Sequence, residues 1–250
     1  MYSFAVYLTS PTDRHGKLSM MARSWNGTLP MLDALLFDLD GTLTDTDRLH
    51  LLALQQLLLE EGRVFTEAEF DAHVSGCANA DMCRYLFPQR SVAEHEVFAD
   101  RKEARFRALS PTLRPTPGLS RLLDHAQQRG IGVAVVTNAP RANAVHMLQA
   151  LGLTARFEHV LVAEELARAK PDPLPYLTGL ECLGAMAQNA LAFEDSVPGV
   201  TAASRAGIFT VGLSTSQAPQ VLLEAGAQLV VADFDDVRLW DLIEQMSVQG

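Results

Sequence analysis

The sequence predicts an α/β fold in which helices cover both faces of a parallel β-sheet and a helical segment is inserted after the first strand. From about residue 31, short apolar runs alternate with segments of helical periodicity, which is typical of βαβ units. The apolar runs are nearly continuous, as expected for strands buried on both faces. The predicted strands are Ala34–Phe37, Gly132–Val136, His159–Val162, Ala190–Phe193, Ile208–Gly212 and Gln228–Val231.

Four predicted helices between these strands each end close to a glycine. Glycine just past a helix end favours the left-handed conformation that caps the last carbonyl groups. The helices are Gly118–Gln128, Arg141–Ala150, Pro173–Leu183 and Pro198–Arg205, and the glycines are Gly130, Gly152, Gly184 and Gly207. The predicted ends of these helices are therefore supported by the capping role of glycine as well as by periodicity.

The segment from Asp47 to Ser110 predicts helices only. Thr66 with Glu69, and Ser91 with Glu94, are the residue pairs of capping boxes that open two of them. A crossover between parallel strands needs only about a dozen residues, so this longer segment is expected to form a separate helical cap. The predicted domains are a core of residues 31–46 and 111–250 and a cap of residues 47–110.

The remaining features limit the class of protein. Residues 1–10 include a short apolar stretch, and residues 11–30 are polar and rich in turn formers. We expect residues 1–30 to form a poorly ordered extension. The 250 residues carry a net charge of −10, which repels nucleic acid. We find no apolar run near the roughly 20 residues of a membrane span. Three cysteines without a metal-binding or CxxC spacing indicate reduced thiols in a cytoplasmic protein.

Polar residues suited to phosphate chemistry follow four consecutive predicted strands. In an open parallel sheet, ligands bind at the carboxyl ends of the strands, so these residues are expected to meet at one edge. The segments are Asp38-Leu39-Asp40-Gly41-Thr42, Thr137-Asn138, Lys170-Pro171-Asp172 and Glu194-Asp195-Ser196.

The two aspartates of the first segment suit the two halves of a phosphoryl transfer. The carboxylate of Asp38 can attack phosphorus and form an aspartyl-phosphate. Asp40 lies two residues further on, so in an extended chain it shares a face with Asp38. It can protonate the leaving oxygen and later activate water.

The other segments supply charge and hydrogen-bond donors. Attack on a phosphate by an anion requires charge neutralisation, which Mg²⁺ held by Asp38 and Asp195, with Glu194 as a further candidate, would provide. Thr137, Asn138 and Lys170 can donate to the oxygens of the transferred group.

These residues resemble the four motifs of the haloacid dehalogenase superfamily. Asp38–Thr46 looks like the first motif, and Thr137, Lys170 with its Pro-Asp-Pro, and Glu194-Asp195-Ser196 resemble the others in the right order. The resemblance covers about residues 31–235. It implies a Rossmann-like core, an α-helical cap between the first two motifs, and magnesium-dependent phosphatase or phosphomutase activity.

The resemblance also implies roles for individual residues. Asp38 would be the nucleophile and Asp40 the acid/base. Thr137 and Lys170 would bind phosphate. The metal ligands would be Asp38, Asp195 and the main-chain carbonyl of Asp40, with Glu194 binding directly or through water.

Within the superfamily, the pattern is similar to the phosphoglycolate phosphatase and β-phosphoglucomutase group. The dehalogenase branch lacks an aspartate at the position of Asp40. His50 stands where the mutases carry a histidine at the cap hinge, and Ser75, Gly76 and Asn79 lie in a segment that resembles the group's cap substrate loop. The mutase pattern has a lysine and an arginine where this chain has Ser75 and Asn79, which favours a phosphatase acting on a small phosphorylated metabolite.

Three alternatives stay open from the sequence. One is a β-phosphoglucomutase-like sugar phosphomutase, and another is a non-catalytic phosphate-binding relative. The third is a receiver domain that only accepts phosphate on an aspartate, against which the inserted helices and Asp40 both argue.

Overall fold

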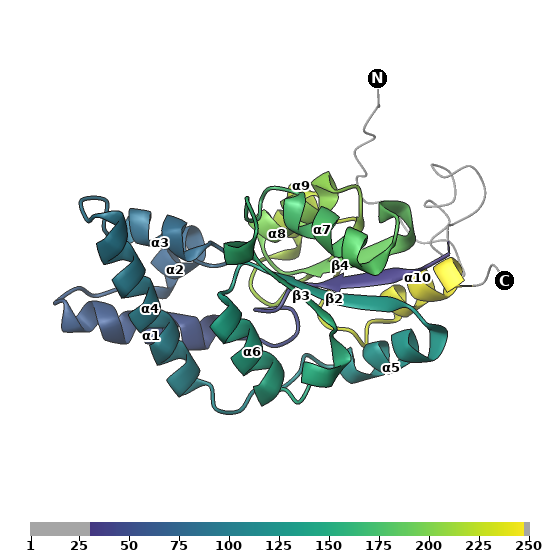
Figure 1. The fold of residues 1–250 in the computed structure, drawn as a ribbon, viewed down its shortest axis with the longest axis horizontal. Coiled ribbons are helices and arrows are strands. Elements are labelled where there is room, and N and C mark those ends of the chain that lie inside the picture. Colours follow the sequence, from purple (N-terminus) through teal and green to yellow (C-terminus); the bar gives the residue numbers. More distant parts are fainter. Residues whose placement is uncertain (1–30, 248–250) are drawn as a thin grey trace, which may run out of the picture.

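A computed structural model describes residues 31–247 of the chain, and the expectation for residues 1–30 falls outside this range. The core is a six-stranded parallel sheet in the order β3-β2-β1-β4-β5-β6. Figure 1 shows this sheet between helices that lie above and below it. The strands are β1 (Ala34–Phe37), β2 (Gly132–Thr137), β3 (His159–Val162), β4 (Ala190–Glu194), β5 (Phe209–Leu213) and β6 (Leu229–Val231). The predicted fold class is confirmed, and all six strands lie within one residue of their predicted bounds.

The order of the strands reverses at β1. The chain passes from β1 outwards to β2 and β3, and then returns to the other side of β1 to build β4, β5 and β6. Phe37 at the end of β1 pairs with Val135 of β2 and with Phe193 of β4. The carboxyl ends of β1 and β4 therefore lie side by side at the switch point, where open α/β sheets bind their ligands.

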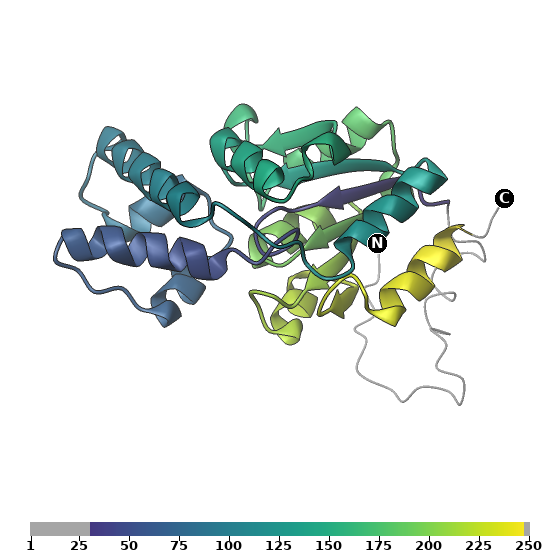
Figure 2. The same ribbon diagram turned by 90° about the horizontal axis from the view of Figure 1, so that it is seen from below.

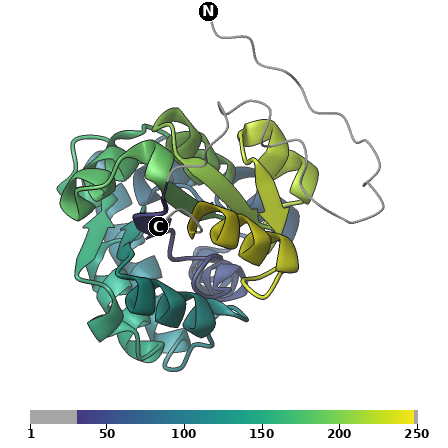
Figure 3. The same ribbon diagram turned by 90° about the vertical axis from the view of Figure 1, so that its right-hand side faces the viewer.

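Helices cover both faces of the sheet. One face packs against α5 (Leu119–Arg129), α6 (Arg141–Ala150) and α10 (Val237–Ser247), and the other against α7 (Leu174–Leu183) and α8 (Val197–Arg205), beside which lies α9 (Pro219–Ala225). Figure 3 views this arrangement from the end opposite the cap. The strand residues alternate between the two apolar clusters, with Leu35 and Phe37 in one and Ala34 and Leu36 in the other.

The first four of the five helices between β1 and β2 form a cap at one end of the molecule (Figure 2). They are α1 (Asp47–Glu60), α2 (Glu67–His73), α3 (Asn79–Leu86) and α4 (Val92–Leu109). Both predicted capping boxes are present, at the start of α2 and of α4. The cap has an apolar cluster of its own, which includes Leu57, Phe70, Met82 and Phe98. Within residues 31–247, no helix has the length and apolar character needed to cross a membrane.

One glycine sets how closely a helix approaches the sheet. Gly179 lies in the middle of α7, and a Cβ there would lie 2.7 Å from Leu36 Cδ2 and 3.3 Å from Val136 Cγ2. Both neighbours are fully buried. The substitution Gly179→Ala should lower the free energy of unfolding by about 1–2 kcal/mol, because overpacking outweighs the gain in helix propensity. Urea unfolding measures this, and a variant as stable as the parent would show that Leu36 moves aside without strain.

Candidate functional site

Four strand ends bring buried polar side chains to one edge of the sheet. Asp38 follows β1, Thr137 ends β2, Lys170 follows β3, Glu194 ends β4 and Asp195 follows it. All five are less than 9% exposed. A main-chain hydrogen bond of 2.9 Å from Asp38 N to Phe193 O extends the β1–β4 pairing past the last strand residue. The structure thus brings together residues that lie far apart along the chain.

The ammonium group of Lys170 lies between two carboxylates. Its Nζ donates to Asp38 Oδ1 and to Glu194 Oε1, each at 2.5 Å. Burial opposes the charge on Lys170, but the two carboxylates outweigh it and raise its pKa. The lysine is therefore a fixed positive charge beside Asp38.

Glu194 is held from several sides. The hydroxyl group of Tyr176 donates to its Oε1 at 2.5 Å, on the same oxygen that receives Lys170. A Cβ at Gly199 would lie about 2 Å from its carboxylate atoms, so only glycine fits there. Tyr176 and Gly199 were not identified from the sequence, because apolar helix patterning does not reveal which residues face a buried carboxylate.

Asp38, Glu194 and Asp195 form a carboxylate cluster, with one oxygen of each lying within 4.8 Å of the others. Burial raises the pKa of Asp38, and the charge of Lys170 only partly offsets this. Burial and then the charge of Asp38 raise the pKa of Asp195. The cluster retains negative charge that a cation would relieve, and its oxygen donors fit a hard divalent ion.

The loop after β5 holds this cluster in place. Thr215 Oγ1 donates to the carbonyl of Gly41 at 2.5 Å, and Ser216 donates to Asp195 Oδ2. Gly41 has φ +73°, and a Cβ there would lie 1.9 Å from Asp195 Oδ2. The sequence analysis missed Thr215 and Ser216, although they follow the fifth strand at the same edge as the recognised segments.

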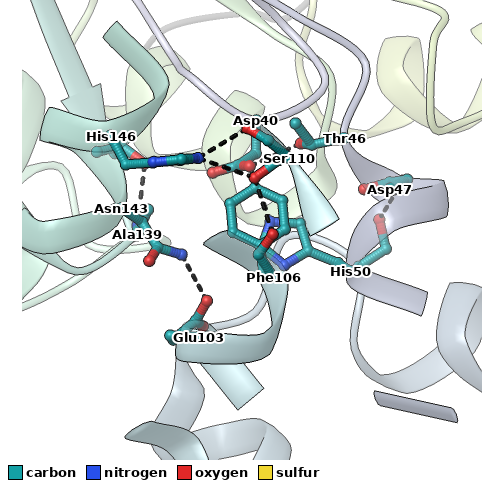
Figure 4. A network of polar contacts seen from close by, with 12 residues as sticks. Asp40, Thr46, Asp47, His50, Glu103, Phe106, Ser110, Ala139, Asn143 and His146 are labelled. Carbon is teal, nitrogen blue, oxygen red and sulfur yellow. Dashed lines mark hydrogen bonds and ion pairs between the residues drawn. The ribbon is translucent and has the colours of Figure 1, made fainter. Parts of the chain in front are cut away.

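Asp40 accepts hydrogen bonds from two residues at the base of the cap. Thr46 Oγ1 donates to Asp40 Oδ1 at 2.6 Å, and His50 Nε2 lies 2.9 Å from the same oxygen (Figure 4). Burial opposes ionisation of Asp40, but His50 outweighs it and lowers the pKa of this carboxyl. Asp40 is thus ionised at neutral pH in the substrate-free protein.

The tautomer of His50 follows from its other neighbour. Lys102 Nζ lies 2.9 Å from His50 Nδ1, and an ammonium group can only donate. Nδ1 therefore accepts, and Nε2 carries the proton that is donated to Asp40. The imidazole ring stacks on Phe106 with centroids 3.8 Å apart. His50, predicted as a cap residue, thus contacts the core residue Asp40 directly.

A buried polar chain continues from Lys102 to the core. Lys102 donates to Glu103 Oε1 at 2.9 Å. Asn143 of α6 donates to Glu103 Oε2, as Figure 4 shows. Lys102 and Glu103 are 6% and 5% exposed. This chain joins helix α4 of the cap to the core. Sequence reasoning missed it, since α4 is rich in charged residues and the pattern does not show which of them face inwards.

The loop between α2 and α3 lies over the carboxylate cluster. Ser75 Oγ donates to Asp47 Oδ2 at 3.2 Å. Gly76 has φ +71°, and a Cβ there would lie 2.6 Å from Ser196 Cβ. The cap loop therefore touches the residue that follows Asp195, and only glycine allows this approach.

A cavity of about 80 Å³ separates cap and core. Every predicted site residue except Glu194 lines it, and Asp47, Lys102, Glu103 and Asn143 line it as well. Within it, the side chain of Asn138 is engaged with the main chain of Lys170, accepting from its N–H at 3.1 Å. In this structure Asn138 positions the lysine, while Thr137 accepts a hydrogen bond from the N–H of Ala139.

The free energy of unfolding should depend on pH in the acid range through the contacts of Glu103. Burial opposes ionisation of Glu103, but the charge of Lys102 outweighs it and the pKa of Glu103 is lowered to about 2. Because the folded pKa lies below the unfolded value near 4.5, the ionised group stabilises the fold above that value and loses this effect as the pH falls towards 2. The stability difference between the parent and Glu103→Gln should therefore be constant above about pH 5.5 and shrink below it. Urea unfolding from pH 3 to pH 7 measures the difference, and a pH-independent result would contradict the assignment.

Comparisons with known proteins agree with this fold and site. Residues 35–213 match the family model of the haloacid dehalogenase-like hydrolases. The chain is 32% identical over 210 residues to a validoxylamine A 7'-phosphate phosphatase of Streptomyces hygroscopicus subsp. limoneus, covering 83% of this chain and 97% of that protein. It is 30% identical over 210 residues to a phosphoglycolate phosphatase of Agrobacterium fabrum, covering 82% and 90%.

Solved structures show the same fold. A β-phosphoglucomutase from Clostridium difficile superposes with a TM-score of 0.75 at 24% identity, covering 86% of this chain and 97% of that one. The resemblance to the phosphoglycolate phosphatase and β-phosphoglucomutase group is thereby confirmed. On the match over residues 35–213 and these relatives, the chain belongs to the haloacid dehalogenase-like hydrolase family.

Proposed function

We propose that the protein is a magnesium-dependent phosphatase that hydrolyses a small-molecule phosphomonoester through an aspartyl-phosphate at Asp38. As a haloacid dehalogenase-like hydrolase with named phosphatases among its relatives, the chain is a phosphoric monoester hydrolase. The main support for an aspartyl-phosphate at Asp38 is the position of this residue. Asp38 is buried between Lys170 and Asp195 and lines the cavity.

In the first step, a carboxylate oxygen of Asp38 attacks phosphorus and the bond from phosphorus to the ester oxygen breaks. Asp40 in its protonated form gives its proton to the leaving alcohol. The pKa of Asp40 is lowered in the substrate-free protein, and the approach of a phosphate dianion raises it towards the value that an acid requires. The hydrogen bonds from Thr46 and His50 hold Asp40 in place.

In the second step, the carboxylate of Asp40 takes a proton from water, and the water oxygen attacks the phosphorus of the aspartyl-phosphate. Inorganic phosphate leaves and the carboxylate of Asp38 is restored. Thr137 and Lys170 donate to the phosphoryl oxygens, and Asn138 keeps Lys170 in position. The cap excludes bulk water during the first step, as lids commonly do.

The carboxylate cluster fits Mg²⁺, which would be held by Asp38, Asp195 and the main-chain carbonyl of Asp40. The ion would supply charge neutralisation between the anionic nucleophile and the phosphate. Glu194 shares one oxygen between Lys170 and Tyr176, so its main role is to orient the lysine and to add negative charge near the ion.

A sugar phosphomutase is the alternative. It is supported by 28% identity over 223 residues to a β-phosphoglucomutase of Bacillus subtilis. A mutase must hold two phosphates, and the loop residues Ser75 and Asn79 are uncharged, which favours the phosphatase. Incubation with a sugar phosphate distinguishes them, since a phosphatase releases inorganic phosphate and a mutase returns an isomer.

Replacement of the nucleophile should abolish turnover. With p-nitrophenyl phosphate and Mg²⁺ we expect EDTA-sensitive hydrolysis, and Asp38→Asn should lower kcat by at least about a thousandfold. The variant should fold, because asparagine has the size of aspartate and its amide oxygen can still accept the hydrogen bond from Lys170 Nζ. The control is Asp241→Asn, an exposed aspartate on α10, with unchanged kcat. Retained activity in Asp38→Asn would reject the nucleophile, and absent turnover in the parent would support the non-catalytic alternative.

The β5 loop should tune metal binding without contacting the substrate. Ser216→Ala removes the hydrogen bond to Asp195, and the dissociation constant of Mg²⁺ should rise by roughly tenfold, as for other groups that orient metal ligands. Isothermal titration of the substrate-free protein with Mg²⁺ measures this. The matched control is Ser214→Ala, because the Ser214 hydroxyl donates to the carbonyl of Val231 instead. This control should leave the constant unchanged, and equal constants in all three proteins would remove Ser216 from the metal site.

A further inference from the structure

The wall of the cavity opposite the phosphate site comes from the cap. It combines apolar side chains with short uncharged polar ones, and consists mainly of Phe70, Val74, Ser75, Cys77, Asn79 and Met82. This wall faces the part of a substrate that leaves as the alcohol, since Asp38, Thr137 and Lys170 lie on the core side.

Among the residues that the structure describes, the cavity offers no free cation to that part of the substrate. The lysines that line it are Lys102 and Lys170, and both are paired. Lys170 bonds Asp38 and Glu194, and Lys102 bonds Glu103, whose pKa of about 2 keeps it ionised. No arginine from residues 31–247 lines the cavity.

Two arginines of the cap form ion pairs away from the cavity. Arg105 donates to Glu60 at 2.9 Å and to Gln56, and Arg84 pairs with Asp81. Neither lines the cavity. These positive charges of the cap are thus paired with its own surface carboxylates.

Carboxylates outnumber cations around the cavity. Those that line it are Asp38, Asp40, Asp47, Glu103 and Asp195. One divalent ion and one phosphate dianion cancel each other's charge, so the excess of carboxylates persists in the loaded site. A further carboxylate or phosphate on the substrate would lose its hydration and meet like charge.

We infer that the alcohol part of the substrate is a small polyol without negative charge. This inference rests on the proposed phosphatase function and names its substrate class. Hydroxyl groups of the polyol pair with Ser75 and Asn79, and its carbon chain packs on Phe70, Val74 and Met82. The cavity of about 80 Å³ is small, which suits an alcohol of only a few carbon atoms beside the phosphate.

The test uses two substrates of the same size that differ in charge. Glycerol 3-phosphate and 3-phosphoglycerate differ by a hydroxymethyl group in place of a carboxylate. The ratio of their kcat/KM values should favour glycerol 3-phosphate by at least about tenfold. A ratio near or below one, or hydrolysis of neither while p-nitrophenyl phosphate is hydrolysed, overturns the inference and leaves the phosphatase standing. Failure on all three esters overturns both.

A substitution that changes the charge at the cavity wall tests the electrostatic origin of this substrate preference. Glu103→Gln keeps a group that can bond Asn143 but leaves Lys102 without its carboxylate. The preference for glycerol 3-phosphate should fall by about fivefold, since an unpaired ammonium then lines the cavity. The ratio is compared within one variant, so a general loss of activity cancels. The matched control is Glu96→Gln on the same helix, where the glutamate is exposed and outside the cavity, and its ratio should equal that of the parent. An unchanged ratio in Glu103→Gln contradicts the electrostatic explanation.

Discussion

The buried ammonium group of Lys170 is the interaction on which the site depends. Three carboxylates within 4.8 Å of one another repel in a medium of low dielectric. Lys170 lowers that repulsion by bonding two of them at 2.5 Å each. Tyr176 and Gly199 then fix Glu194, which leaves Asp38 and Asp195 facing the cavity. The same lysine is the proposed donor to the phosphoryl group, so one residue would support both the folded site and the proposed chemistry.

A second polar chain ties Asp40, the proposed acid/base residue, to the cap. Asp40, His50, Lys102, Glu103 and Asn143 follow one another through hydrogen bonds that run from the core through the cap and back to the core. The proton on His50 Nε2 is directed to Asp40 because Lys102 occupies Nδ1. These hydrogen bonds join the cap to the core on both sides of the cavity.

The charge balance of the cavity connects the site with its proposed substrates. Relatives of this chain carry names that include a phosphoglycolate phosphatase and a validoxylamine A 7'-phosphate phosphatase, which name different phosphate esters. Family membership therefore does not select the substrate. The pairing of every lysine at the cavity with a carboxylate is a property of this chain, and it is the basis for assigning an uncharged alcohol.

The sequence alone determined the α/β class, the six strands, the helical insertion and the order of the four motifs. These depend on local periodicity, capping residues and short segments, all of which are readable along the chain. It also placed Asp38, Lys170 and Asp195 at one edge, because parallel strands share a carboxyl end. The tertiary structure alone decided that Ser216, Tyr176, Lys102 and Glu103 belong to the site. Their roles depend on which face of a helix or loop turns inwards across long separations in sequence, and neighbouring residues along the chain carry no signal for that choice.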